Sequence, residues 1–513
     1  MDYLVETTTD RAIIETLKGR SPVILRGSRG VGKSFLLRVA ETELLASINT
    51  DKVLPVYVTF ARATLITDPT AERFLLWMMA KLCNQIVRAA SVNGYTLPEG
   101  ATIAAIRGEN TSSARSHLQN IEDSFENAWR GAQEIDPKDV PGPETIRDAV
   151  EDLCRHTGLN RIAVFVDEAA HVFLPEQQRQ FFTLMRDLRS PFISVKAAVY
   201  PGATAFGHSF QPSHDATVLT VDRTVTERQY SEAMREIVLK QDRSISTSIE
   251  RNGEIFDVLA YAATGNPRIL LKTLSRSTPF NRRNVQESIR EYYREEIWAE
   301  HSSLAERFPG HRELIDWGRT FIESDVLPEL HRRNKGGNKE TSSYIWVHRD
   351  APQAAREALR LLCYSGILQE GVSGIRATRS EVGTRYMVNL GCQFALNAEP
   401  VSYGAQVRRS LSIKRFVEFG ANHHAYKKIK DFAISDLDAS DNLALTARLA
   451  TSSSVLDISS FQKSKLAELK LATIGQVLGA SERDFTKAYY VGEKRARQMR
   501  NAAVAAVLEY LSG

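Results

Sequence analysis

The octapeptide Gly27-Ser28-Arg29-Gly30-Val31-Gly32-Lys33-Ser34 follows the apolar run Val23–Leu25 and precedes a helical pattern over Phe35–Leu45. It matches the pattern G-x-x-x-x-G-K-[ST] in full, between the strand and the helix that this pattern requires. Glycines let the backbone fold its N–H groups around phosphate oxygens, and the N-terminus of the next helix adds partial positive charge. The stretch therefore predicts a loop that binds the phosphates of a nucleotide.

The side chains of this loop have separate chemical roles. Lys33 reaches the β and γ phosphates, and the Ser34 hydroxyl is a ligand for Mg²⁺. A glycine-rich turn formed by chance is the alternative, and the flanking strand and helix argue against it. We predict that ATP contacts every residue of the loop and the residue after it: Gly27, Ser28, Arg29, Gly30, Val31, Gly32, Lys33, Ser34 and Phe35.

A second motif supplies acidic groups. The run Arg161–Val166 is an apolar strand pattern, and it ends in the adjacent carboxylates Asp167 and Glu168. We predict that Asp167 lies in the Mg²⁺ shell and that Glu168 acts as the general base that orients the attacking water. A strand that simply ends in solvated acids is the alternative.

Five short runs, rich in β-branched or apolar residues, divide the first 225 residues. Runs of this kind, each followed by a turn or a helical pattern, are typical of buried parallel strands with helical crossovers. We predict an α/β fold, a P-loop NTPase parallel sheet, over 1–225 with a helical insertion at about 61–160. The runs are Val23–Leu25, Val56–Phe60, Ile162–Val166, Ile193–Val199 and Thr217–Val221.

The rest of the chain is mainly helical in pattern. The helix predicted over Ala351–Ser365 is followed by two strand-like pieces, Ile367–Gln369 and Arg385–Val388, which is the order of a winged helix. We expect four further parts: a helical lid over 226–300, a winged-helix-like domain over 301–395, linker helices over 396–455 and a compact helical domain over 456–513.

A third motif, Gly265-Asn266-Pro267-Arg268, lies in the predicted lid. Together with the phosphate loop and the Asp-Glu strand end, it resembles AAA+ ATPases, most of all the ORC/Cdc6-like branch and its STAND relatives. The resemblance covers residues 1 to about 390. It implies ATP hydrolysis and a catalytic role for Arg268, which would contact the γ-phosphate and couple lid closure to the nucleotide state. An exposed arginine after a Gly-Asn-Pro turn is the alternative.

Two features depart from the family pattern. A polar residue is expected after the fourth strand, and Thr204 is the candidate there, with Tyr200 as the other hydroxyl. An arginine finger is expected between the fourth and fifth strands, yet the stretch Tyr200–Ala216 contains neither Arg nor Lys. A slow switch, or nucleotide binding with negligible hydrolysis, therefore stays open beside a motor.

The predicted winged helix could touch DNA. Arg356 and Arg360 are four residues apart and project together from the helix before the wing. Winged helices commonly place that helix in the major groove. A winged helix that contacts protein is the alternative.

The C-terminal part is similar to a helix-hairpin-helix unit and to the C-terminal domain of the bacterial RNA polymerase α subunit. Gly492 matches the second hairpin glycine, whereas Tyr490 occupies the position of the first. Residues 487–500 carry five basic side chains and one acidic, which suits contact with phosphates. A solvated basic helix in a protein-docking domain is the alternative. The candidate DNA contacts are Lys487, Gly492, Lys494, Arg495 and Arg497.

Composition limits the function classes. In 513 residues, 66 Lys and Arg against 62 Asp and Glu give a net charge of +4, so a basic surface must be local. Four separated cysteines form no CxxC pair, which disfavours a zinc site or a disulfide framework. No apolar run approaches the roughly 18 residues that span a bilayer. We expect a cytoplasmic protein without a membrane partner.

Two hypotheses follow. The first is an ATP- and Mg²⁺-dependent AAA+ switch that couples nucleotide state to double-stranded DNA, in replication, transposition or genome defence. The second is a STAND-like signalling or scaffold ATPase whose C-terminal modules hold protein partners. Both leave homo-oligomerisation open.

Overall fold

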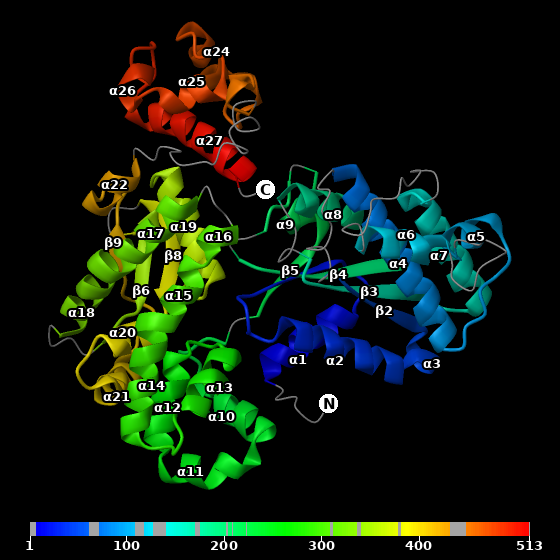
Figure 1. Ribbon diagram of the computed structural model, residues 1–513, viewed down its shortest axis with the longest axis horizontal. Helices are drawn as coiled ribbons and strands as arrows, with labels where there is room; N and C mark the ends of the chain where they lie inside the picture. The colour runs from blue at the N-terminus through cyan, green and yellow to red at the C-terminus, as the bar shows by residue number, and fades with distance from the viewer. Residues whose placement is uncertain are drawn as a thin grey trace. The chain divides into compact units, whose positions relative to one another are not determined.

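The computed structural model of the chain (Figure 1) divides into two units, described separately below. The first comprises Met1–Gly27 and Val31–Asp222, and the second comprises Ser28–Gly30 and Arg223–Gly513. The structure describes residues 7–60, 71–107, 117–126, 140–169, 175–201, 204–207, 209–221, 223–307, 311–335, 340–377, 381–430 and 448–511.

A five-stranded parallel sheet forms the centre of the first unit, in the order β2-β3-β4-β1-β5. The predicted α/β fold with five parallel strands is confirmed. Strand β1 lies between β4 and β5, so the strand order reverses beside it, which is where α/β sheets bind ligands at the carboxyl ends of their strands. The strands are β1 (Val23–Arg26), β2 (Val53–Thr59), β3 (Arg161–Asp167), β4 (Ile193–Val199) and β5 (Thr217–Thr220).

Both faces of this sheet are covered, which explains why its strands are apolar without alternation. Along β3, Ala163 and Phe165 pack on one face with side chains of α1 and α2. Ile162 and Val164 pack on the other face with side chains of α4 to α8. Figure 1 shows these two layers of helices on opposite sides of the sheet.

The helices of the first unit include the predicted insertion after β2. Apolar residues recur at helical spacing along Ala71–Val92, which forms one long helix. The helix Pro143–Thr157 ends at the cap glycine Gly158, which has φ 71°. The helices are α1 (Thr8–Lys18), α2 (Lys33–Ala46), α3 (Ile48–Asp51), α4 (Ala71–Val92), α5 (Ala101–Arg107), α6 (His117–Glu126), α7 (Pro143–Thr157), α8 (Pro175–Asp187) and α9 (Pro212–Asp215).

The second unit begins with the helices predicted as a lid. Asn266 caps the helix that follows the Gly-Asn-Pro turn, because its side chain accepts from the backbone N–H groups of Arg268 and Ile269. The helices of residues 223–335 are α10 (Tyr230–Gln241), α11 (Ser246–Arg251), α12 (Gly253–Ala262), α13 (Pro267–Arg276), α14 (Arg282–Glu291), α15 (Ile297–Ser302), α16 (Leu304–Arg307), α17 (Arg312–Thr320) and α18 (Leu327–Lys335).

A small sheet follows, in the order β7-β8-β6-β9. Its hairpin β7–β8 comes after helix α19, in the predicted order of helix, strand, strand. Residues 396–455 are not only linker helices, since β9 pairs in parallel with β6 and completes this sheet. A three-residue strand has too short a pattern to be recognised in sequence. The elements are β6 (Tyr344–His348), α19 (Gln353–Tyr364), β7 (Leu368–Arg376), β8 (Val382–Val388), α20 (Leu390–Ala395), α21 (Pro400–Ser410), β9 (Val417–Phe419) and α22 (Lys427–Lys430).

The C-terminal helices have a buried core of their own, in which Leu466, Phe485 and Met499 take part. Three of these helices begin with capping boxes, at Ser459, Thr473 and Ser481, which fix where the helices start. None of the helices in the described ranges combines the length and apolarity needed to cross a membrane. The helices are α24 (Ser460–Glu468), α25 (Ile474–Gly479), α26 (Glu482–Phe485) and α27 (Glu493–Leu511).

Candidate nucleotide site and candidate nucleic-acid surface

The loop after β1 and the end of β3 meet at one edge of the first unit's sheet. Side chains alternate along β3, so Asp167 follows Ala163 and Phe165 on the face covered by α2. Ser34 lies in the first turn of α2, and its Oγ donates to Asp167 Oδ1 over 3.0 Å. Two motifs 133 residues apart are thus joined by one hydrogen bond.

Lys33 is held inside the loop. The side chain is buried, its Nζ donates to Gly27 O at 2.7 Å, and it lies 3.8 Å from the ring centroid of Tyr200. Gly32 precedes α2 with φ 106°, a backbone conformation that only glycine adopts without strain. An added Cβ on Gly27 would come within 2.8 Å of Val31 Cγ2, so this position also requires glycine.

The oxygen atoms at this edge suit Mg²⁺. Ser34 Oγ is an exposed hydroxyl, and Asp167 supplies a carboxylate beside it. Mg²⁺ is usually held by one or two protein oxygens of this kind together with substrate phosphates, and it keeps several waters. The donor set therefore fits the predicted metal, and the assignment of Ser34 and Asp167 as its ligands stays a prediction.

Tyr57 is a member of this site that the motifs did not reveal. Its hydroxyl donates to Asp167 Oδ2 at 2.8 Å, and the Arg38 guanidinium stacks 3.3 Å from its ring centroid. Burial and the Asp167 carboxylate raise the pKa of Tyr57, so the phenol keeps its proton and remains a donor. Tyr57 lies on β2, which pairs with β3, and only that pairing brings it to Asp167.

Glu168 follows with a left-handed backbone, φ 57°, which is uncommon for residues other than glycine. Its N–H donates to Asp167 Oδ1 at 3.0 Å, so one carboxylate oxygen binds both Ser34 and the backbone of Glu168. Strained backbone of this kind is concentrated at functional sites. The geometry is compatible with the predicted base, and that role stays a prediction.

Of the two hydroxyl residues proposed after β4, Tyr200 contacts the phosphate loop, because its ring lies against Lys33. Thr204 Oγ1 donates to Tyr200 O at 2.7 Å, which uses its one donor proton within its own turn. A contact between Thr204 and the nucleotide stays a prediction.

Arg268 is exposed in the first turn of α13. The tripeptide Ser28–Gly30 belongs to the same unit, in which Asn266 Nδ2 donates to Arg29 O at 2.8 Å. An added Cβ on Gly30, which has φ 90°, would lie 2.7 Å from Arg268 Cβ. The motif predicted to report on the γ-phosphate therefore packs against part of the phosphate loop.

The turn before Arg268 has a strained backbone and is hydrogen-bonded to β7 and α20. Thr264 is β-branched and has φ 48°, a genuine outlier for such a side chain. Its carbonyl accepts from Gln369 Nε2 at 2.7 Å, and its Oγ1 accepts from Leu390 N at 2.9 Å. These bonds join the Gly-Asn-Pro-Arg turn to β7 and α20.

The two arginines predicted for the winged helix lie differently. Arg360 is exposed and pairs with Glu357 at 2.8 Å. Arg356 is half-buried and donates to Gln353 Oε1, and burial lowers its pKa. Since Gln353 N also donates to Asn501 Oδ1 of α27, at 3.1 Å, the start of α19 is covered by the chain's own last helix.

Among the predicted C-terminal contacts, Arg497 faces inward. Its side chain is only 12% exposed and binds Glu482 at 3.3 Å and Asn422 Oδ1 at 2.8 Å. Lys487 and Lys494 are exposed, although Lys487 pairs with Asp484 at 2.6 Å and Lys494 with Asp350 at 3.6 Å.

The hairpin turn differs from its expected form. Gly492 is exposed and lacks a positive φ, whereas Tyr490 has φ 63°. The left-handed residue of the turn is therefore at the position of the absent first glycine. Arg495 Nη1 donates to Tyr490 O at 2.6 Å.

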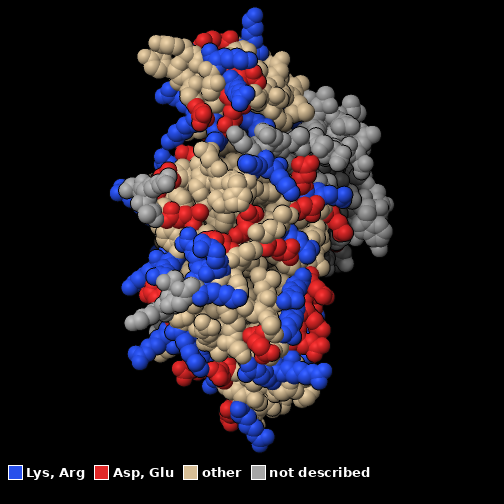
Figure 2. All heavy atoms as spheres, turned by 90° about the vertical axis from the view of Figure 1, so that its left-hand side faces the viewer, with Lys and Arg blue, Asp and Glu red and all other residues tan. Residues whose placement is uncertain are grey.

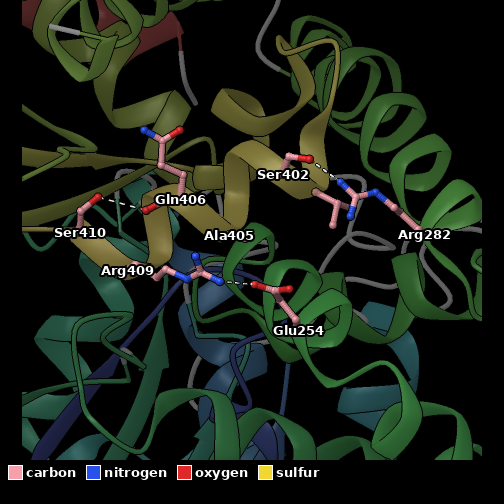
Figure 3. A pocket seen from close by; sticks show the side chains of 8 residues that line it. Glu254, Arg282, Ser402, Ala405, Gln406, Arg409 and Ser410 are labelled. Atoms are coloured by element: carbon pink, nitrogen blue, oxygen red, sulfur yellow. Dashed lines mark hydrogen bonds and ion pairs between the residues drawn. The ribbon is translucent and has the colours of Figure 1, made fainter. Parts of the chain in front are cut away.

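A separate groove of about 470 Å³ lies between α12, α14 and α21 (Figure 3). Its two arginines are already engaged. Arg409 pairs with Glu254 at 2.6 Å, and Arg282 donates to Ser402 Oγ and lies 3.6 Å from Glu399. With its cations neutralised, the groove carries no nucleotide or phosphate assignment.

Comparisons with known proteins give weak similarities. No family model matches the sequence, and no curated protein matches it. A structure of the Aeropyrum pernix ORC1 protein in complex with DNA is similar over 77% of this chain and 92% of its own, at 15% identity and a TM-score of 0.33. The Aeropyrum pernix ORC2 protein, in ADPNP and ADP complexes, is similar over 79% and 95%, at 12% identity and the same TM-score.

Proposed function

We propose that the chain is an ATP-binding and ATP-hydrolysing AAA+ switch of the ORC/Cdc6-like kind. One observation carries the proposal: Ser34 of a complete phosphate-loop motif is bonded to Asp167, the acid at the end of a buried parallel strand. Phosphate-binding enzymes of this class hold Mg²⁺ with the same two residue types.

Each residue of the site has a proposed task. The backbone of Gly27–Ser34 and the Lys33 ammonium hold the β and γ phosphates. Ser34 and Asp167 would hold Mg²⁺, which supplies charge neutralisation on the phosphate oxygens. Glu168 orients and deprotonates the attacking water, since its carboxylate follows the metal-binding acid directly. Arg268 stabilises negative charge on the γ-phosphate and transmits the nucleotide state to the lid.

We further propose that nucleotide state is coupled to DNA. Lys487, Lys494 and Arg495 are exposed basic side chains that suit contact with phosphates, although each also has a partner within the chain. Thr264 links the Arg268 turn to β7 and α20. Arg356 and Arg497 are not part of this proposal, because the first is half-buried and the second is paired inside the domain.

The experiment is steady-state ATP hydrolysis by the full chain, with and without double-stranded DNA, at low and moderate salt. Glu168→Gln supplies the background rate. Stimulation by DNA at low salt that fades at moderate salt supports the coupled switch. A rate that DNA leaves unchanged, with no DNA retained, contradicts the coupling and leaves only the ATPase.

A second function has one specific observation in its favour. The start of α19, the helix expected to enter DNA, is covered by α27 through the bond from Gln353 N to Asn501 Oδ1. A module already used for a protein contact suits a STAND-like scaffold that holds protein partners. Under that alternative, ATP would be hydrolysed slowly and the rate would not respond to DNA.

A further inference from the structure

Two neighbouring tyrosines are exposed at the turn before α27. Tyr489 is 72% exposed and Tyr490 is 69% exposed, and their ring centroids lie 4.3 Å apart with planes at 71°. Neither ring belongs to the core of the C-terminal helices, in which Leu466, Phe485 and Met499 are buried. Packing within the domain therefore does not explain why these two positions are aromatic.

The backbone of Tyr490 adds a second observation. Its φ of 63° is one that bulky side chains rarely adopt, and glycine would adopt it without strain. The turn is nevertheless held in this form, since Arg495 Nη1 donates to the carbonyl of Tyr490. A strained residue that does not serve the core points to a function of its side chain.

One cation, Arg495, links the pair to a third ring. Phe461 of α24 is 40% exposed, and the Arg495 guanidinium lies 5.1 Å from its ring centroid. Arg495 thus joins this ring to Tyr490. Figure 2 shows Lys and Arg side chains among uncharged and acidic ones over the end of the view that contains the C-terminal helices. We call this set the Tyr489 surface: Phe461, Lys487, Tyr489, Tyr490, Lys494 and Arg495.

We propose that the Tyr489 surface binds single-stranded nucleic acid, with unpaired bases stacked on its rings and phosphates bound by its cations. Exposed aromatic rings beside basic side chains are the combination that such strands require, and stacking does not depend on sequence. A duplex keeps its bases stacked inside and could use only the cations. The proposal deepens the DNA coupling above by naming unpaired nucleotides as the partner, and it does not depend on ATP hydrolysis.

The test measures fluorescence anisotropy of a labelled single-stranded oligothymidine of roughly 16 nucleotides with the full chain. The double variant Tyr489→Ala, Tyr490→Gly should weaken binding about 10- to 100-fold. Glycine at 490 suits the left-handed turn, so the thermal unfolding midpoint should not fall in step with binding. The control Tyr489→Phe, Tyr490→Phe keeps both rings and should bind within about threefold of the natural chain.

An abasic strand of the same length separates stacking from charge. It keeps the phosphates and lacks bases, so the Tyr489→Ala, Tyr490→Gly variant should bind it as the natural chain does. Equal binding of oligothymidine by this variant and the natural chain overturns the proposal. Binding of duplex but not of single strands overturns the proposal alone and leaves the DNA-coupled switch. If the full chain retains neither single-stranded nor duplex DNA, this proposal and the DNA-coupled switch are both overturned.

Discussion

Glu168 and Tyr490 are non-glycine residues with nearly the same left-handed φ, 57° and 63°, in two very different settings. Glu168 N–H is bonded to Asp167, whose other oxygen binds Tyr57. Tyr490 is exposed, and Arg495 Nη1 donates to its carbonyl. Removing one group from a site of mutually bonded groups should cost about tenfold or more, whereas removing one exposed charge should weaken binding only about twofold.

The largest expected effect is at Glu168. Glu168→Gln should lower the ATP hydrolysis rate about a thousandfold, because the amide cannot take a proton from water. ATP affinity should change little, since the phosphate loop is intact. Rapid-quench hydrolysis and binding of a fluorescent ATP analogue measure the two quantities. Normal turnover in this variant would show that another group is the base.

The next effect is the loss of the loop's ammonium. Lys33→Ala should weaken ATP binding about a hundredfold, since it removes charge-assisted bonds to two phosphates. Oligonucleotide binding measured without nucleotide should be unchanged, because the C-terminal surface is built by other residues. Calorimetric titration with ATP and anisotropy with DNA give both values. A parallel loss of DNA binding would break the separation between the two regions.

The Tyr57 hydroxyl tests how far the nucleotide site depends on a group that acts through Asp167. Tyr57→Phe removes the donor to Asp167 Oδ2 and should weaken Mg²⁺-dependent ATP binding about tenfold. The defect should shrink when Mg²⁺ is raised, because a misplaced ligand lowers metal affinity. Tyr95→Phe removes a hydroxyl elsewhere in the same unit and serves as the control. A defect that ignores Mg²⁺ would argue for a merely structural role.

Lys196 is a buried lysine and contrasts with the exposed ones. Its Nζ donates to Gly19 O and Ser21 O inside the first unit, and burial lowers its pKa to about 7. Between about pH 7 and 10 the unfolded chain binds a proton that the folded chain lacks, so this residue makes the free energy of unfolding rise with pH. The rise should be about 1 kcal/mol per pH unit. Lys196→Met should flatten it in urea unfolding at pH 7 and 9, and parallel profiles would contradict the assignment.

The smallest expected effect is on the exposed surface. Lys494→Gln should weaken DNA binding about twofold and reduce the slope of log K against log salt by about one. Lys414→Gln removes an exposed charge outside the C-terminal helices and should leave the slope unchanged. Fluorescence anisotropy over a series of salt concentrations measures this slope for both variants. Equal slopes of log K against log salt would remove Lys494 from the contact surface.

Local patterns were enough to predict the parallel strands and the phosphate loop. Val23–Leu25 and Ile162–Val166 are apolar without interruption because both faces of the sheet are covered, and these residues are buried in the two cores on either side of it. Tyr57 was missed because nothing near it in sequence distinguishes it from a strand tyrosine. The sequence did not predict that Arg497 faces inward, because the charge of a residue does not reveal a partner such as Glu482.

By itself, the sequence determined the α/β fold, the glycines of the loop and the acids at the strand end, since these depend on short-range periodicity and backbone conformation. Only the tertiary structure decided that Tyr57 holds Asp167, that Arg356 is half-buried beside α27, and that Tyr490 takes the left-handed place in its turn. Such facts depend on strand register and on which helix covers which face, and those are set by contacts between residues far apart in the chain.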